Sequence, residues 1–198
     1  MKSLNLIENY DSKNLFKKVN ILTEEQIIAI AMGLEWTITH LPNSVLIGGT
    51  AVIHYISGTR DLTPDLDFMV KDINSLKSKF AHQNITYREL FIGKVLGITV
   101  DKFNVDYFDS EIGNKELNWL TLQNPIIGII GGYQVKIIAP ELLAIMKFEL
   151  GREKDINDAF ALLSSGKCNI NKYVSYVNKL KNSLQDYESL IGYKLLIQ

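Results

Sequence analysis

The chain has 198 residues, of which 46% are hydrophobic and 22% charged, and this composition is typical of a folded globular protein and excludes a disordered one. Lys and Arg total 21 against 22 for Asp and Glu, so the chain lacks the net positive charge that would bind nucleic acid by bulk electrostatics. The single cysteine, Cys168, excludes an intrachain disulfide and a cysteine-rich zinc site.

The hydrophobic segments are too short or too interrupted for export or membrane insertion. The first 20 residues contain no continuous apolar core of the kind that a signal peptide needs. The longest apolar run, "PIIGIIGGYQVKIIAP", is broken by glycines and Lys136 and falls short of the roughly 20 residues that span a bilayer. We therefore expect a cytoplasmic protein without a membrane segment.

The N-terminal half alternates helical and strand patterns. Residues 22–41 open with a capping-box pattern and are dense enough in apolar residues for a largely buried helix. Residues 44–49, "SVLIGG", predict a short buried strand, and residues 50–57 predict a helix that ends at the following glycine. Residues 65–70, "DLDFMV", predict the next strand.

Further strands and then helices follow toward the C-terminus. Residues 85–109 alternate well enough for two or three strands, and residues 133–140 predict a final strand or extended connection. From Pro140 the pattern becomes helical, with two helices meeting near Gly151, and from residue 169 one further helix with a buried stripe is expected.

This order predicts an α+β fold in which a small mixed β-sheet is flanked by helices. Residues 1–138 form the core with the N-terminal helices, and residues 139–198 form a C-terminal helical lobe. Because no repeat, low-complexity tract or flexible linker divides the chain, this lobe should pack directly on the core.

Two carboxylates one residue apart are the first candidate for chemistry. Side chains alternate along a strand, so Asp65 and Asp67 share one face while Leu66 and Phe68 point to the other. Like charges this close repel unless a cation lies between them, and Mg²⁺ with oxygen ligands is the usual solution. By itself the pair is better explained as a solvated loop that leads into a strand.

A glycine pair precedes the carboxylates by one predicted helix. Gly48 and Gly49 would let backbone N–H groups approach an anion where a Cβ would block it, and Thr50 can cap the same turn. A tight turn that needs positive φ would explain the glycines without any ligand. Arg60 is a cation near this turn, suited to bidentate phosphate binding or to an ion pair with Asp61 or Asp65.

A third carboxylate would complete a metal site built from more than one strand. Asp106 in "FNVDYF" is the best candidate, because Val105 and Tyr107 lie on the opposite face of the expected strand. Asp101 and Asp109 are alternatives at the expected strand ends. A carboxylate satisfied by hydrogen bonds alone would also explain Asp106.

A polar stripe follows in the C-terminal helical pattern. Lys147, Gly151, Lys154, Asp155 and Asp158 recur at intervals of three and four residues, opposite the apolar side chains. Such a stripe is most often a solvated face, but this one contains cations that could meet a triphosphate.

Together these motifs resemble the DNA polymerase β-like nucleotidyltransferases, and among them the AbiEii-type toxin nucleotidyltransferases. The resemblance rests on "GGTAVIHY", "TPDLDF", "NVDYF" and "KFELGREKDINDAFALL" and covers residues 45–163, more than half of the chain. It implies the nucleotidyltransferase fold, with Asp65 and Asp67 holding two Mg²⁺ ions. Asp106 would be the third carboxylate, a metal ligand and the base for the acceptor hydroxyl.

The same resemblance assigns the other candidate residues. Asp155 and Asp158 are similar to positions that brace the cleft of the family. The residues expected to bind the phosphates of a nucleoside triphosphate are Gly48, Gly49, Thr50, Arg60, Lys147 and Lys154.

The implied activity is Mg²⁺-dependent transfer of a nucleotide from a nucleoside triphosphate, such as ATP, to an acceptor hydroxyl. The AbiEii resemblance favours a toxin that acts on RNA, such as a tRNA end, and that has a cognate antitoxin protein. The alternatives are a small-molecule acceptor such as an antibiotic, AMP transfer to protein, and a catalytically silent nucleotide-binding module.

Overall fold

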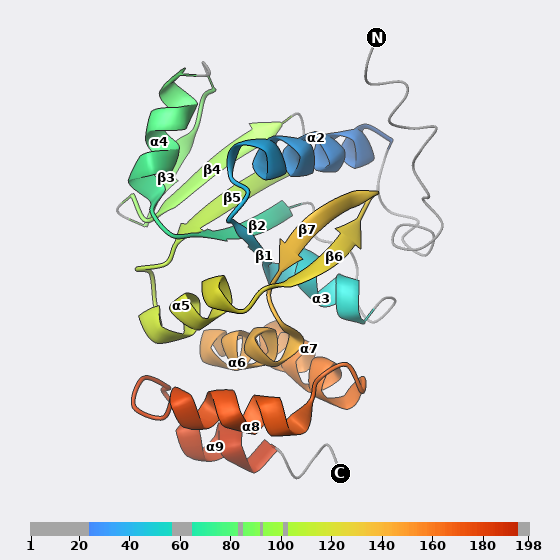
Figure 1. Ribbon diagram of the computed structural model, residues 1–198, viewed down its shortest axis with the longest axis vertical. Helices are drawn as coiled ribbons and strands as arrows, with labels where there is room; N and C mark the ends of the chain where they lie inside the picture. The colour runs from blue at the N-terminus through green and yellow to red at the C-terminus, as the bar shows by residue number, and fades with distance from the viewer. Residues whose placement is uncertain (1–23, 57–64, 83–84, 92, 101–102, 194–198) are drawn as a thin grey trace.

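The computed structural model describes residues 24–56, 65–82, 85–91, 93–100 and 103–193 (Figure 1). Within these residues the chain forms a seven-stranded mixed sheet and eight helices. This confirms the predicted α+β class. No helix in the described ranges is long and apolar enough to cross a membrane.

The sheet has the strand order β3-β4-β5-β2-β1-β7-β6. Its centre is mixed, because β2 pairs parallel with β5 and antiparallel with β1, while β1 pairs parallel with β7. The strands are β1 (Val45–Ile47), β2 (Asp65–Val70), β3 (Arg88–Leu90), β4 (Val95–Val100), β5 (Phe103–Asp109), β6 (Ile126–Ile130) and β7 (Tyr133–Ile137).

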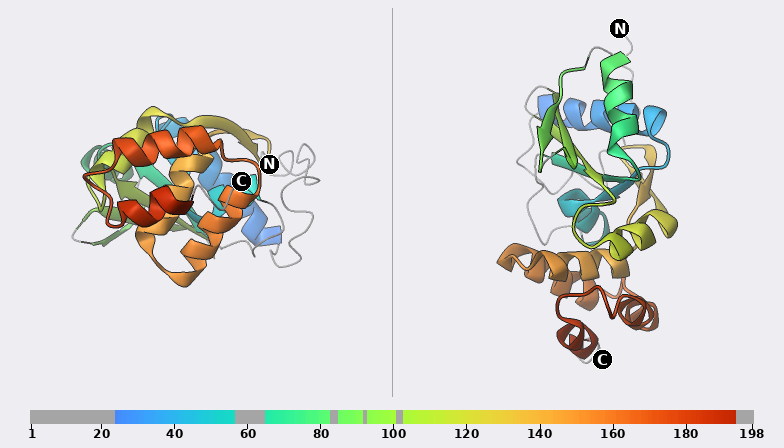
Figure 2. Two further views of the ribbon diagram at one scale, coloured as in Figure 1. Left: turned by 90° about the horizontal axis from the view of Figure 1, so that it is seen from below. Right: turned by 90° about the vertical axis from the view of Figure 1, so that its left-hand side faces the viewer.

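Helices cover both faces of the sheet. Helix α2 lies across one face, and α6 to α9 stack beyond the other, with α8 and α9 farthest from α2 (Figures 1 and 2). The helices are α2 (Glu24–His40), α3 (Gly48–Tyr55), α4 (Ile73–His82), α5 (Lys115–Gln123), α6 (Pro140–Leu150), α7 (Glu153–Ser164), α8 (Ile170–Lys179) and α9 (Tyr187–Gly192).

The structure confirms several local expectations. Residues 85–109 contribute three strands, and Pro140 is the first residue of α6. Gly151 ends α6 in the left-handed conformation, with φ 68°, which a residue with a Cβ adopts only at a cost. The division into a core of residues 1–138 and a lobe of residues 139–198 stays a prediction.

Other elements differ from the sequence pattern. Helix α3 begins at Gly48, so the glycine pair forms its first turn and does not precede it. The single helix expected from residue 169 is two helices, α8 and α9. The pattern also missed α4, α5 and β6. Strand β6 has little alternation of residue type, because it consists of isoleucines around Gly128.

The core on the α2 face is aromatic and contains one buried hydrogen-bond relay. Tyr107 on β5 is fully buried, and its ring lies near Trp36, Phe68 and Phe80. The Thr37 hydroxyl donates to the Gly33 carbonyl at 2.7 Å and lies 2.8 Å from the Tyr107 hydroxyl. Since Thr37 has one hydroxyl hydrogen, Tyr107 is the donor in the second bond.

Tyr107→Phe should therefore destabilise the fold by about 1 kcal/mol, because it removes one buried hydrogen bond and leaves the ring packing intact. Tyr187→Phe is the matched control: it removes an exposed hydroxyl that donates to Asn178, and its effect should be within about 0.5 kcal/mol. Urea unfolding measures both, and equal losses in the two variants would contradict the buried relay.

Candidate active site

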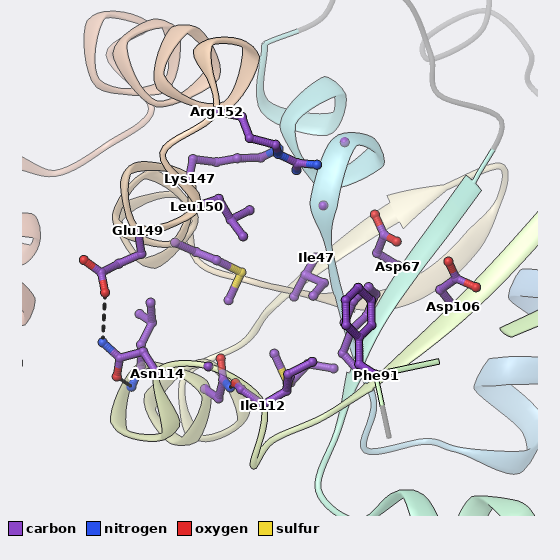
Figure 3. Close-up of a pocket in the computed structure, with 18 of the residues that line it drawn as sticks. Ile47, Asp67, Phe91, Asp106, Ile112, Asn114, Lys147, Glu149, Leu150 and Arg152 are labelled. Atoms are coloured by element: carbon purple, nitrogen blue, oxygen red, sulfur yellow. Dashed lines mark hydrogen bonds between the residues drawn. The ribbon is translucent and has the colours of Figure 1, made fainter. Parts of the chain in front are cut away.

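A pocket of about 630 Å³ lies between the sheet and helices α5 and α6 (Figure 3). Its volume is in the range of small-molecule binding sites. One part is polar and charged, lined by Gly48, Gly49, Asp65, Asp67, Asp106, Lys147, Arg152 and Lys154. The other part is largely apolar and includes Met69, Phe91, Phe108, Ile112, Leu117, Met146 and Leu150.

Two neighbouring strands bring the three predicted carboxylates to the pocket. Asp65 and Asp67 line it, whereas Leu66 and Phe68 are buried on the α2 face, as the alternation predicted. Strands β2 and β5 are parallel, and Asp67 is in register with Asp106. Residues directly opposite each other point to the same face, so Asp106 also lines the pocket, and Figure 3 shows it beside Asp67.

The alternative carboxylates are not part of this group. Asp109 is buried, and its side chain accepts hydrogen bonds from the backbone N–H groups of Ile73 and Glu111. It therefore has a structural role at the end of β5. Asp101 lies outside the described residues.

Two of the three carboxylates, Asp67 and Asp106, have a raised pKa. The pKa of Asp67 is raised to about 7, mainly by burial and further by the charges of Asp65 and Asp106, although Lys147 and Arg152 oppose the rise. Burial also raises the pKa of Asp106, Arg88 opposes this, and Asp65 adds to it. The negative charge at this point of the sheet is therefore only partly compensated by the side chains around it.

A divalent cation fits this group by charge and by donor type. Asp65 Oδ1 is buried and has no hydrogen-bond partner among the described residues. A buried oxygen without a donor is costly, and carboxylate oxygens are the ligands that Mg²⁺ prefers. Among the described residues, no three His, Cys, Asp or Glu side chains are already arranged closely enough to bind a metal ion. Asp65, Asp67 and Asp106 are the residues that would hold the ion.

Gly48 lets the Asp67 carboxylate lie against the start of α3. The glycine has φ +69°, and a Cβ at this position would lie 1.9 Å from Asp67 Oδ2. Both the backbone angle and the close approach therefore exclude other residues. Gly49 lines the pocket beside Gly48, whereas Thr50 does not line it and donates its hydroxyl to the Asp65 carbonyl at 3.1 Å.

A corner between α6 and α7 supplies the cations. Lys147 is buried, and its Nζ lies 2.6 Å from Asp155 Oδ1 and 3.0 Å from Asp158 Oδ2. Arg152 Nε also donates to Asp155. Burial alone would raise the pKa of Asp155, but hydrogen bonds and charges from Lys147 and Arg152 outweigh it, so the pKa is lowered.

This corner corrects the expected polar stripe along one helix. Lys147 and Asp155 are on different helices, and they meet because the chain turns at Gly151. Lys147 and Arg152 extend toward the Asp67 side of the pocket (Figure 3). Lys154 is exposed and also lines the pocket. Arg60, the remaining predicted phosphate-binding residue, lies outside the described residues.

Arg152 and Phe91 are among the pocket residues that sequence reasoning missed. Arg152 belongs to the motif "KFELGREKD", and its place next to Gly151 at a helix corner is a signal that could have identified it. Phe91 is 69% exposed at the pocket and has φ 50°. Positive φ is rare for a bulky residue, and no sequence pattern marks it here.

No protein-family model matches the chain, and no curated protein matches it by sequence. Among solved structures, an antigenic nucleotidyltransferase-like protein from Paracoccidioides brasiliensis aligns with 86% of this chain and 93% of its own, with a TM-score of 0.51 and 16% identity. This likeness confirms the predicted nucleotidyltransferase fold.

An antibiotic-resistance factor and an antibiotic adenylyltransferase are also among the similar structures. ANT(2'')-Ia matches with a TM-score of 0.47 and 14% identity over 79% of this chain and 95% of its own. The lincosamide antibiotic adenylyltransferase LnuA matches with a TM-score of 0.44 and 13% identity over 73% of this chain and 98% of its own.

Gly48→Ala should disrupt the pocket, whereas Gly166→Ala should not. Both glycines have positive φ, so each substitution costs about 1–2 kcal/mol of stability. Only at Gly48 does the new Cβ meet Asp67, because nothing lies within 4 Å of a Cβ at Gly166. Isothermal titration with Mg²⁺ and ATP should show binding lost in the first variant and kept in the second. Equal affinities would contradict the role of Gly48.

In metal-free buffer, Asp67 should make the protein less stable as the pH rises. The pKa is about 7 in the folded protein and about 3.9 in an unfolded chain, so the folded state binds the extra proton between these values. Urea unfolding in EDTA should show the stability of wild type falling relative to Asp67→Asn from about pH 4 to 7 and levelling off above. A constant difference across this range would contradict the raised pKa.

Proposed function

We propose that this protein is a Mg²⁺-dependent nucleotidyltransferase that moves a nucleoside monophosphate from a nucleoside triphosphate to an acceptor hydroxyl. The observation that carries the proposal is the convergence in one pocket of three carboxylates, a glycine-opened helix start and a cationic corner. The three carboxylates line the acidic side of the pocket. Its basic side is lined by Lys147, Arg152 and Lys154. The fold, with its solved relative, supports the same reaction class.

In the proposed reaction, some pocket residues position the substrates and Asp106 accepts a proton. The acceptor oxygen forms a bond to the α phosphorus, the bond from that phosphorus to the pyrophosphate oxygen breaks, and pyrophosphate leaves. Asp106 accepts the proton of the acceptor hydroxyl, since it lies one strand away from Asp65 and Asp67. Mg²⁺ held by these carboxylates supplies charge neutralisation at the phosphates when bound.

The phosphates lie between the α3 start and the α6–α7 corner in this proposal. Gly48 and Gly49 line the pocket there without side chains, while Arg152 and Lys154 offer cations from the opposite wall. Lys147 is held by Asp155 and Asp158, so its ammonium is fixed before a substrate arrives. Positioning of this kind is the main catalytic contribution in phosphoryl-type transfer.

The acceptor that we favour is RNA, with the protein acting as a toxin that a cognate antitoxin restrains. The AbiEii-like motifs at residues 45–163 support this proposal, and a tRNA end would present a suitable hydroxyl. A small-molecule acceptor, such as an antibiotic, is the second candidate. It is supported by the largely apolar part of the pocket beside the carboxylates, which includes Met69, Phe108 and Leu117.

Incubation with each α-labelled nucleoside triphosphate, Mg²⁺ and total cell extract tests the proposal. Label should enter RNA in the presence of the wild-type protein, and Asp67→Asn should reduce transfer by at least about 1,000-fold, because it removes a charge that holds the metal and phosphates. Glu116→Gln is the control, since it removes an exposed carboxylate outside the pocket and should leave transfer unchanged.

The other outcomes separate the alternatives. Label in small molecules instead of RNA would favour the second candidate, and label in protein would indicate AMP transfer to protein. Calorimetric binding of Mg²⁺ and a triphosphate without pyrophosphate release in any extract would contradict the enzyme and favour a silent module.

A further inference from the structure

A row of four residues crosses the sheet in register at the level of the carboxylates. Arg88 on β3 is opposite Gly97 on β4, Gly97 is opposite Asp106 on β5, and Asp106 is opposite Asp67 on β2. Opposite residues in neighbouring strands share a face of the sheet. Arg88 therefore projects on the same face as the two carboxylates, with a residue that has no side chain between them.

The arginine uses that space to reach Asp106. Its Nη2 donates to Asp106 Oδ1 at 3.2 Å, and its Nη1 lies 3.4 Å from Thr99 Oγ1. A Cβ at residue 97 would lie 2.5 Å from Asp106 Oδ1 and 2.8 Å from Arg88 Nε. Both side chains would have to move if residue 97 had a Cβ, so the observed geometry of the ion pair depends on the glycine.

This contact distinguishes Asp106 from the other two carboxylates. Among the described residues, Asp106 has an ion-pair partner, whereas no cation lies within ion-pair distance of Asp65 or Asp67. Arg88 engages one oxygen of Asp106, and the second oxygen takes no part in the pair. The Arg88 guanidinium is also directed toward Thr99, and this second contact fixes its plane. The fixed guanidinium in turn restricts the rotation of the Asp106 carboxylate.

Stability does not explain the pair. The Arg88 side chain is 44% exposed and the Asp106 side chain 18%, and ion pairs near the surface contribute little to folding. Arg88 is also not among the residues that line the pocket, so it is not placed to bind a phosphate there. The remaining role for Arg88 is to control how the Asp106 carboxylate is oriented toward the pocket.

We propose that Arg88 is a positioning residue that holds Asp106 by one oxygen across Gly97, so that the other oxygen faces the acceptor hydroxyl. This inference rests on the proposed nucleotidyl transfer and adds a specific requirement to it. Arg88 acts through Asp106 and touches neither the nucleotide nor the acceptor. Loss of Arg88 should therefore slow the chemical step and leave nucleotide binding unchanged.

Steady-state kinetics of label transfer to the acceptor fraction of the extract, with varied ATP and saturating Mg²⁺, test this role. Arg88→Gln should lower kcat by about 10- to 100-fold with the KM for ATP unchanged, because a misoriented base affects only the chemical step. Arg88→Lys should have a higher kcat than Arg88→Gln but a lower one than wild type, since lysine keeps the positive charge and lacks the planar guanidinium. Gly97→Ala should reproduce the loss by separating the pair.

Lys77→Gln is the matched control. Lys77 on α4 forms a similar, partly exposed ion pair, 3.1 Å from Glu89, which is the neighbour of Arg88 on β3. This pair does not include any of the three carboxylates. The kcat of Lys77→Gln should equal that of wild type. All four variants should have the unfolding midpoint of wild type within about 5 °C, because exposed pairs contribute little and Gly97 lies near movable side-chain atoms.

The double variant Arg88→Gln/Asp106→Asn separates positioning from an independent effect. If Arg88 acts through Asp106, the double variant should be no slower than Asp106→Asn alone, whereas independent roles would give additive losses and overturn the inference. A raised KM for ATP with unchanged kcat in Arg88→Gln would also overturn it, by making Arg88 a phosphate-binding residue.

Failure of the inference can be told from failure of the proposed function. A wild-type protein that transfers no label contradicts the function itself. An active wild type, an inactive Asp67→Asn and a fully active Arg88→Gln would contradict only the role of Arg88. An activity-independent readout is ¹⁵N NMR of the Arg88 guanidinium: its restricted rotation should be lost in Asp106→Asn and kept in Glu116→Gln.

Discussion

Electrostatic repulsion among three carboxylates on one face of two neighbouring strands is the constraint around which this site is arranged. Asp65, Asp67 and Asp106 are brought together by the alternation of β2 and by its parallel register with β5. Their mutual effect is visible in the pKa of Asp67, which burial and the other two charges raise to about 7. The repulsion within a group of this kind is relieved when a cation lies between the carboxylates.

The surrounding positive charge is held in place by other ion pairs. Lys147 is buried between Asp155 and Asp158, and a buried cation of this kind needs partners to offset its lost hydration. The pairs also join α6 to α7, so the corner at Gly151 is fixed and Arg152 stays beside the pocket. The same contacts thus stabilise the helical corner and direct positive charge toward the carboxylates.

Much of the fold and part of the site could be predicted from local pattern. The strand that carries Asp65 and Asp67, the three strands of residues 85–109 and the helix pair at Gly151 follow from alternation, helix signals and glycine chemistry. Helices α4 and α5 and strand β6 were missed. In β6 every residue is isoleucine or glycine, so periodicity carries no information about which face is buried.

By itself, the sequence determined which side chains share a face of one element, because the periods of strands and helices are local properties of the backbone. It thus identified the Asp65 and Asp67 pair and its link to Gly48. Only the tertiary structure decided what different elements bring together: the register of Asp67 with Asp106, the approach of Asp67 to Gly48, and the reach of Arg88 across Gly97. These contacts depend on strand order and register, which are set by the packing of the whole sheet and are not encoded in any single segment.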